Sequence, residues 1–203
     1  MVATTPKRLP QPLTRDEVRT LFAALPRQGA VAARNRALLA LMYRAGLRVS
    51  EVCRLRLSDL DAASLALHIR KGKGGRDRTV YPDLEAWRIL GNWLAAHPGG
   101  EWLFPLLRAT PWRPSLDSDR HVTPRYVEAL VAKLARRAGI RKRVTPHTLR
   151  HTFATEAVSE GIPLHQVQRD LGHAHLATTA IYLHVADSER EARARTRAPA
   201  GIA

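Results

Sequence analysis

The sequence predicts an α+β protein that is mostly α-helical and carries one small antiparallel β-sheet. Three observations lead to this fold class. Apolar residues recur at helical spacing behind N-capping residues in several segments. Only the stretch 65–81 changes to the alternating pattern of half-buried strands, around a glycine-rich turn. A hydrophobic content of 45% in 203 residues is sufficient for one packed core.

The first elements are an arm and a capped helix. Residues 1–12 are rich in Pro and Thr and predict an arm that becomes ordered only on contact. Thr14 and Glu17 form a T-x-x-E capping box ahead of an apolar helical face. This pattern predicts a first helix, which Pro26 ends.

A nearly all-apolar segment follows and predicts a central helix over residues 30–45. Gly46 ends this helix, and a tight corner that contains Arg48 leads into another helix. Cys53 lies in that helix and is interpreted as a small buried hydrophobic residue. As the single cysteine, it excludes an internal disulfide.

The predicted sheet is a hairpin. Leu65, Leu67 and Ile69 alternate with small or polar residues, as in a half-buried strand. The glycine-rich segment 71–76 predicts the turn, and residues 78–81 predict the returning strand.

The remaining elements follow from capping and stop signals. Thr-Pro pairs at 123–124 and 145–146 are typical of an N-cap followed by proline at the first helical position. Residues 97–122 are rich in Pro and Gly and predict a loop with a short apolar island at 102–104. The predicted helices are 83–96, 124–138, one opened by Pro146, and 164–171 closed by Gly172.

The stretch 145–184 holds polar side chains that a packed helical domain would not require. His147 would lie in the first helical turn, where free N–H groups and the helix dipole favour an anion. Arg150 follows three residues later and shares a face with it. His173 directly follows the predicted cap at Gly172, and Tyr182 carries a phenol that an arginine could activate toward phosphorus. The cation pair therefore indicates a site for a phosphate or a carboxylate, and the phenol favours phosphorus chemistry.

The charge points to a polyanionic partner. A net charge of +15 and a pI near 11.3 favour nucleic acid as this partner. An anionic membrane surface is the rival, but no segment approaches the ~20 apolar residues of a membrane span. The N-terminus lacks the apolar core of a signal peptide. We therefore expect a cytoplasmic, nucleoid-associated protein.

Six residues stand out together: Arg48, Lys73, His147, Arg150, His173 and Tyr182. The strings AGLRVSEV, GKGGRDRTV, HTLRHTFAT and LGHAHLATTAIYLHV that surround them resemble those of the tyrosine recombinases, also called the phage integrase family. The resemblance covers about residues 13–195 and includes all six positions in order. It implies the catalytic-domain fold of that family and a site-specific recombinase that cleaves and rejoins DNA.

The resemblance also implies a role for each residue. Tyr182 would attack a DNA phosphodiester and form a 3′-phosphotyrosine. Arg48 and Arg150 would hold the non-bridging oxygens. Lys73 would protonate the leaving 5′-oxygen, with Lys71 as the alternative acid. His147 would help to move the tyrosine proton, and His173 would hydrogen-bond the phosphate. No metal or other cofactor is implied.

The predicted organisation is an arm at 1–12, a catalytic domain at 13–185 and a C-terminal helix or tail at 186–203. The resemblance implies that this last segment docks on a neighbouring protomer in a homotetramer on DNA. Family members usually carry an additional N-terminal domain of roughly 100 residues. We therefore expect a minimal recombinase, a fragment, or a protein whose partner supplies that domain.

The predicted DNA contacts are Lys71, Arg76, Arg136, Arg137, Arg141, Lys142 and Arg143.

Other interpretations remain open. A type IB topoisomerase-like strand relaxer would use similar chemistry, and a non-catalytic DNA-binding accessory protein would use none. His147 and His151 could be metal ligands at i and i+4, but no third ligand is obvious. Asp59 and Asp61, expected at the start of the strand region, could bind a metal as in carboxylate nucleases. The glycine-rich turn lacks the G-K-[ST] ending of a nucleotide-binding loop.

Overall fold

A computed structural model describes residues 11–70, 77–108 and 115–172 of the chain. The fold is α+β, as predicted, with helices around a central helix and two small antiparallel sheets. The helices are α1 (Arg15–Ala23), α2 (Ala30–Arg44), α3 (Val49–Cys53), the 3-10 helix η1 (Leu57–Asp59), α4 (Leu84–Ala95), α5 (Pro124–Arg137), α6 (Pro146–Ser159) and α7 (Leu164–Leu171). The strands are β1 (Leu60–Asp61), β2 (Ala66–Ile69), β3 (Arg78–Val80), β4 (Pro105–Arg108) and β5 (Ser115–His121).

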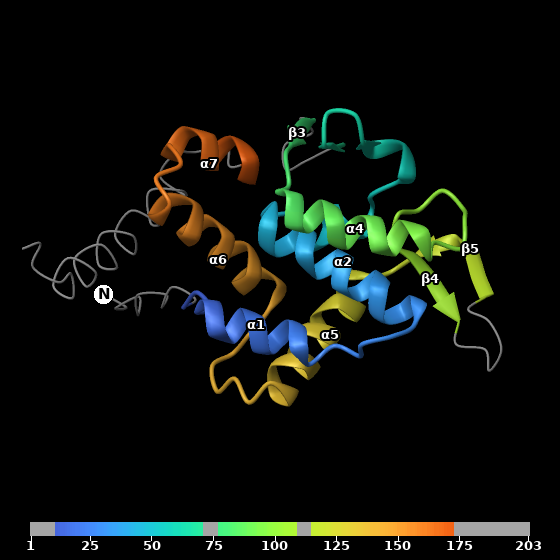
Figure 1. Cartoon of the computed structure of the whole chain (residues 1–203), viewed down its shortest axis with the longest axis horizontal. Coiled ribbons are helices and arrows are strands. Elements are labelled where there is room, and N and C mark those ends of the chain that lie inside the picture. Colours follow the sequence, from blue (N-terminus) through green and yellow to red (C-terminus); the bar gives the residue numbers. More distant parts are fainter. Residues whose placement is uncertain (1–10, 71–76, 109–114, 173–203) are drawn as a thin grey trace, which may run out of the picture.

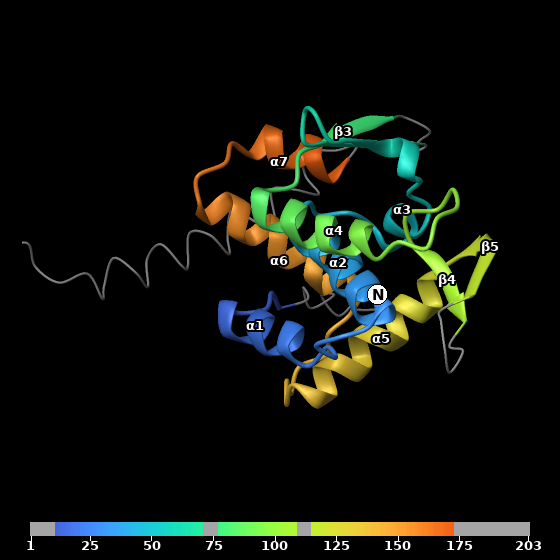
Figure 2. The same ribbon diagram turned by 45° about the vertical axis from the view of Figure 1, so that its right-hand side comes forward.

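Helix α2 is the centre of the core. Leu38, Leu39, Leu41 and Met42 on successive sides of this helix are completely buried. Helix α4 runs beside α2, and α6 packs against another side of it (Figure 1). The same arrangement is visible after rotation, with α1 and α5 covering the opposite end from α7 (Figure 2). A helix that is apolar on nearly all sides requires such a surrounded position.

The predicted helix boundaries follow the capping signals. Thr14 and Glu17 form a reciprocal capping box, with hydrogen bonds of 3.2 and 2.8 Å. Thr145 accepts from the main-chain N–H of the third helical residue, and Pro146 occupies the first turn of α6. Gly172 adopts the left-handed conformation at the C-terminal cap of α7, with φ of 60°. These positions satisfy main-chain groups that helix ends leave unpaired.

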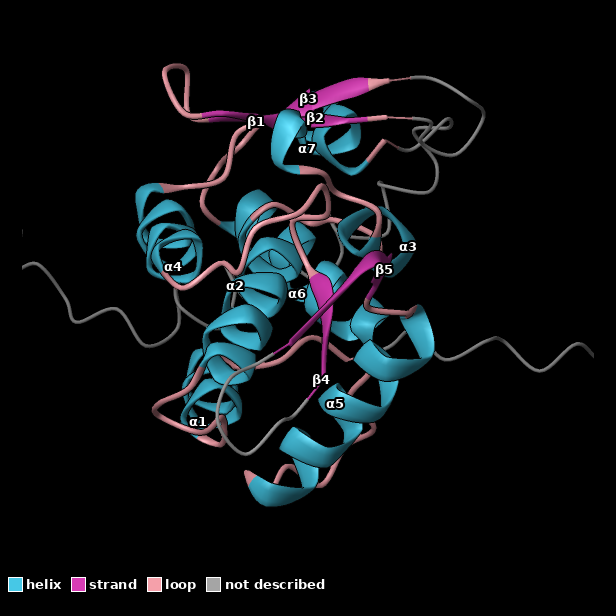
Figure 3. Cartoon of the chain, turned by 90° about the vertical axis from the view of Figure 1, so that its right-hand side faces the viewer, coloured by secondary structure: helices cyan, strands magenta, loops and turns pink. Residues whose placement is uncertain are grey.

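The three-stranded sheet has the order β1-β2-β3 and lies at one end of the molecule beside α7 (Figure 3). Leu67 pairs with Val80, and both are buried. The prediction was wrong for Leu65, which precedes β2 in a turn and is 38% exposed with a positive φ of 52°. Its carbonyl accepts a hydrogen bond from the Trp87 indole at 3.0 Å. The turn therefore places the start of the strand one residue later than the alternation indicated.

The loop predicted for 97–122 was also wrong in part, because β4 and β5 form an antiparallel hairpin there. The sequence of β5, SLDSDRH, is almost entirely polar, so it lacks the apolar alternation that identifies a strand. The hairpin is defined by the main-chain pairing of its two strands, which the sequence does not reveal. The predicted apolar island is real: Leu103 and Phe104 are fully buried.

No helix in the described ranges is both long and apolar enough to span a bilayer.

The corner after α2 depends on Gly46. Its φ is +62°, and a Cβ built there would lie 2.4 Å from Cδ1 of Phe153 on α6 and 2.9 Å from Cδ2 of Leu171 on α7. The absence of a side chain therefore lets α6 and α7 approach the end of α2.

Replacing Gly46 with alanine should destabilise the fold through a steric clash as well as through its backbone conformation. Gly139→Ala is the matched control, because Gly139 has a similar φ of +71° but an added Cβ there would meet nothing within 4 Å. We expect G46A to lower the free energy of unfolding by about 1–3 kcal/mol more than G139A. Urea denaturation of the three proteins measures this difference, and equal losses would contradict a role in close packing.

Candidate active site

Arg48 stands at the corner between α2 and α3, directly after Gly46 and Leu47. Its main-chain N–H and its Nη1 donate to the two carboxylate oxygens of Glu51, each at 2.8 Å. Its Nη2 donates to the carbonyl of Gly172, at the end of α7, at 2.9 Å. The side chain is 18% exposed. The corner therefore fixes this guanidinium at the edge of the core, between α3 and α7.

Arg150 reaches the same place from α6. It is buried, and its Nη1 donates to the carbonyl of Gly46 at 2.6 Å. Its Nη2 donates to the carbonyl of Leu171 at 2.6 Å. Arg48 and Arg150 thus bind the carbonyls of two consecutive residues, although about half of the chain separates them in sequence. The structure brings together these two predicted site residues.

His147 lies in the first turn of α6 and is exposed, as its position behind the Thr145 cap predicts. The predicted apolar stripe beyond Arg150 is also present, since Ala154 and Ala157 are buried. The site residues of α6 consequently lie at the end of a buried helix face, with one cation inside and one imidazole at the surface.

Three of the six predicted catalytic residues, Lys73, His173 and Tyr182, lie outside the described residues, as do Lys71 and Arg76. The described chain nevertheless fixes the elements next to them. β2 and β3 pair on either side of the segment that contains Lys73. Gly172, the residue before His173, is in contact with Arg48.

Two further residues belong to this constellation, and sequence reasoning did not single them out. The buried Glu51 accepts both terminal nitrogens of Arg78, at 2.8 Å each, in addition to the contacts of Arg48. Arg78 also donates from Nε to the carbonyl of Asp170 at 2.9 Å. Glu51 stands three residues after Arg48 at a helix start, which is the capping-box spacing and could have identified it. No local signal marks Arg78, because its partners lie 27 and 92 positions away.

The charge of Glu51 is strongly stabilised. Burial alone would raise the pKa of this carboxyl group, but the hydrogen bonds and charge of Arg78 and the contacts of Arg48 outweigh it. The resulting pKa is lowered to about 2. Glu51 is therefore a carboxylate at any physiological pH and holds two guanidiniums in place.

The comparisons with known proteins agree with this arrangement. The model of the phage integrase family matches residues 11–189. The chain belongs to the phage integrase family. Its relatives include a tyrosine recombinase of Thermosipho africanus, 35% identical over 91% of this chain and 60% of that protein. Another is the tyrosine recombinase XerA of Pyrococcus furiosus, 37% identical over 89% of this chain and 59% of that protein.

Solved structures of the family share the fold. A crystal structure of XerA recombinase superimposes with a TM-score of 0.75 at 32% identity, over 98% of this chain and 68% of that one. A XerH site-specific recombinase bound to its palindromic difH substrate gives 0.71 at 27% identity, over 92% and 53%. The chain thus spans about three fifths of the length of the curated relatives named above. Family and fold, both predicted from the residues around the site, are confirmed.

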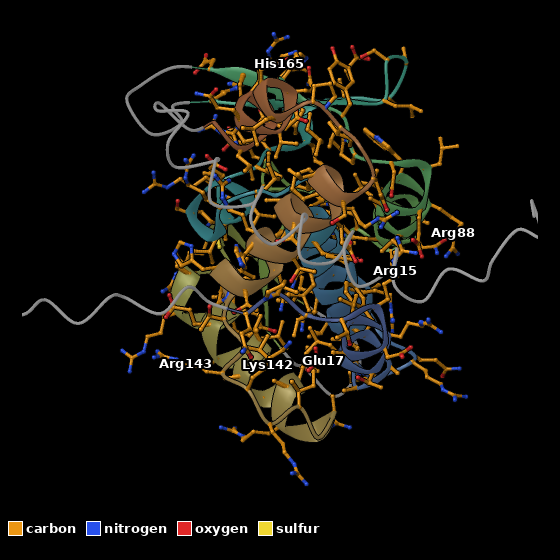
Figure 4. The ribbon with its side chains drawn as sticks, turned by 90° about the vertical axis from the view of Figure 1, so that its left-hand side faces the viewer. Arg15, Glu17, Arg88, Lys142, Arg143 and His165 are labelled. Carbon is orange, nitrogen blue, oxygen red and sulfur yellow. The ribbon has the colours of Figure 1, made fainter. Side chains whose placement is uncertain are left out.

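The basic segment 136–143, predicted to contact DNA, covers the last turn of α5 and the loop after it and lies far from α7. Figure 4 shows Lys142 and Arg143 near Glu17, at the other end of the molecule from His165 of α7. Lys142 is half-buried, pairs with Glu17 at 2.7 Å and donates to the carbonyl of Pro12. The other four predicted contacts in this segment are exposed: Arg136, Arg137, Arg141 and Arg143. Only Lys142 has a clear role within the fold itself.

Two of the candidate metal ligands, Asp59 and Asp61, have other partners. Asp59 ends a 3-10 helix, instead of lying beside Asp61 on a strand as expected, and pairs with Arg70 at 2.6 Å. Asp61 accepts main-chain N–H groups of the following turn. His151 is buried whereas His147 is exposed. Within the described ranges, no three His, Cys, Asp or Glu side chains are grouped as a metal site.

Replacing Glu51 with glutamine should remove a pH-dependent part of the stability. A carboxylate whose pKa is lowered by folding stabilises the protein above its unfolded pKa, and this stability is lost as the pH falls toward the folded pKa. For Glu51 this window extends from its ordinary 4.5 down to about 2. The difference in unfolding free energy between wild type and E51Q should therefore shrink by roughly 2 kcal/mol between pH 6 and pH 3. Urea denaturation as a function of pH measures it, and a constant difference would refute the assignment.

Proposed function

We propose that this chain is a site-specific DNA recombinase or integrase that cleaves and rejoins DNA through a 3′-phosphotyrosyl intermediate. The observation that carries the proposal is the convergence of Arg48 and Arg150 at the end of α7. Two guanidiniums fixed at one point offer several N–H donors to the non-bridging oxygens of a single phosphate. Such preorganised donors act where charge develops in the transition state.

The described partners leave positive charge available for this phosphate. Two hydrogen bonds of Arg150 go to main-chain carbonyls, which orient the guanidinium without neutralising it. Glu51 is a carboxylate that Arg48 and Arg78 share, so its charge is divided between two guanidiniums. Three guanidiniums converge on the end of α7, and this concentration of positive charge suits a phosphodiester that gains negative charge as it becomes five-coordinate.

In the proposed reaction the phenolic oxygen of Tyr182 attacks phosphorus and gives up its proton with the help of His147. The bond between phosphorus and the 5′-oxygen breaks, and Lys73 donates a proton to the leaving oxygen. His173 hydrogen-bonds the phosphate. The new phosphotyrosine conserves the energy of the phosphodiester, so a 5′-hydroxyl of a second strand can reverse the step without ATP.

Several properties support double-stranded DNA as the substrate. The chain carries a net charge of +15, which favours a polyanion. One structural relative is a XerH recombinase bound to its difH substrate.

In keeping with such a substrate, we propose that the protein assembles as a homotetramer on DNA, with segment 186–203 docked on the neighbouring protomer. Because the chain spans about three fifths of its relatives, we also propose that an additional domain or partner completes the grip on DNA.

Replacing Tyr182 with phenylalanine should abolish the covalent intermediate, because phenylalanine has no nucleophilic oxygen. The assay incubates protein with a nicked suicide duplex, from which the short fragment that carries the free 5′-hydroxyl diffuses away, and detects the adduct on a denaturing gel. Wild type should form the adduct, and peptide mapping should locate it at Tyr182. An adduct formed by Y182F would refute the nucleophile, and no adduct with wild type would favour a non-catalytic DNA-binding protein. Relaxation of any supercoiled plasmid by the monomer would favour the topoisomerase alternative.

Neighbouring cations after α5 should differ in their contribution to DNA binding. Arg143 is exposed two residues before the cap of α6, whereas the ammonium of Lys142 is held by Glu17 and the Pro12 carbonyl. We expect R143Q to reduce the slope of log affinity against log salt by about 0.9, the value for one phosphate contact. K142Q should leave the slope nearly unchanged and lower the melting temperature instead. Fluorescence anisotropy at several salt concentrations measures both slopes, and equal slope changes would contradict this division.

A further inference from the structure

Arg78 is the first residue of β3, on the strand that returns from the segment containing Lys73. Its side chain is only 9% exposed, although it carries a charge. The guanidinium packs closely on the end of α7, because a Cβ built on Gly172 would lie 3.1 Å from its Cζ and its Nη1. A largely buried arginine beside the proposed phosphate site, but with no role in the proposed chemistry, requires an explanation.

Within the described part of the chain, the hydrogen bonds of Arg78 lead to elements of the site. Nη1 and Nη2 donate to the two carboxylate oxygens of Glu51, and Nε donates to the carbonyl of Asp170. The two contacts with Glu51 form a bidentate ion pair, and the contact of Nε with Asp170 fixes the orientation of the planar guanidinium. Arg78 therefore ties β3 to α3, which begins at Arg48, and to the end of α7.

The sharing of Glu51 has an electrostatic consequence for Arg48. One oxygen of Glu51 accepts both Arg48 Nη1 and Arg78 Nη1, and the other accepts Arg78 Nη2 and the main-chain N–H of Arg48. The carboxylate charge is thereby divided between two guanidiniums. Without Arg78, the whole charge of Glu51 would act on Arg48 alone, and the carboxylate would be free to take both terminal nitrogens of Arg48.

We propose that Arg78 is a positioning residue that shares the charge of Glu51 and so keeps Arg48 oriented and available for the phosphate. This inference rests on the proposed function. It assigns Arg78 no contact with DNA. Its effect passes through Glu51, a carboxylate that would otherwise neutralise one of the two guanidiniums that hold the non-bridging oxygens.

The charge-sharing role predicts an unusual double-variant result. R78M should lower the rate constant of single-turnover cleavage by roughly 10–100-fold, the loss typical of groups that orient an active-site ligand. Adding E51Q should restore part of that loss, because the carboxylate that neutralises Arg48 is then absent. R78K keeps the charge and loses only the bidentate geometry, so it should fall between R78M and wild type. If R78M and the double variant react equally slowly, charge sharing is refuted.

A modified substrate separates this role from a merely structural one. The nicked suicide duplex is prepared with a methylphosphonate at the cleaved position, which replaces one charged non-bridging oxygen with a methyl group. Since Arg48 is needed chiefly for that charge, the rate ratio between wild type and R78M should approach one on this substrate. Thermal denaturation checks that R78M is folded. If it is not, R78K replaces it in this comparison, and the same convergence of rates is expected. A ratio that stays the same on both substrates would overturn the proposal.

Failure of this proposal differs from failure of the proposed function. If wild type forms no adduct with either duplex, the proposed function fails and the role of Arg78 fails with it. If wild type forms the adduct and R78M and R78K cleave the ordinary phosphodiester at the wild-type rate, only the role of Arg78 is refuted.

Discussion

Three arginines donate to three consecutive carbonyls at the end of α7, and the rest of the site depends on this contact. Arg78 binds the carbonyl of Asp170, Arg150 that of Leu171 and Arg48 that of Gly172. The last carbonyls of a helix have no partner within the helix and carry the negative end of its dipole. Guanidiniums are thus suited to this position. Because the arginines come from β3, α6 and the α2–α3 corner, one helix end joins three distant parts of the chain.

Close packing makes this contact possible. Gly46 has no side chain where Phe153 and Leu171 approach it, and its carbonyl accepts the second hydrogen bond of Arg150. The same guanidinium therefore joins the end of α2 to the end of α7. Since α2 lies at the centre of the core, with Leu38, Leu39, Leu41 and Met42 completely buried, the position of the arginines is set by the hydrophobic core. Rigid support of this kind is what a site with preorganised donors needs.

The sequence predicted local features well because they depend on neighbouring residues. The caps at Thr14 and Thr145 and the left-handed Gly172 follow from side chains within four positions of each helix end. The hairpin β4–β5 was missed because its strands lack apolar alternation and are defined by main-chain pairing. The convergence of Arg48 and Arg150 was expected only through the family resemblance. The ion pair of Arg78 with Glu51 depends on tertiary contacts, which no spacing rule encodes.

The carbonyls of α7 also explain how arginines can be held in place and still bind a phosphate. A carbonyl oxygen is a neutral acceptor, so it orients a guanidinium without cancelling its charge, whereas a carboxylate would do both. Each guanidinium has five N–H donors, and Arg48 and Arg150 each place two nitrogens on acceptors within the described part of the chain. A phosphate oxygen is charged and competes well with a carbonyl for the same donors. In the proposed reaction, the helix end would therefore keep the arginines together before DNA binds, and little reorganisation would be needed when charge develops at phosphorus.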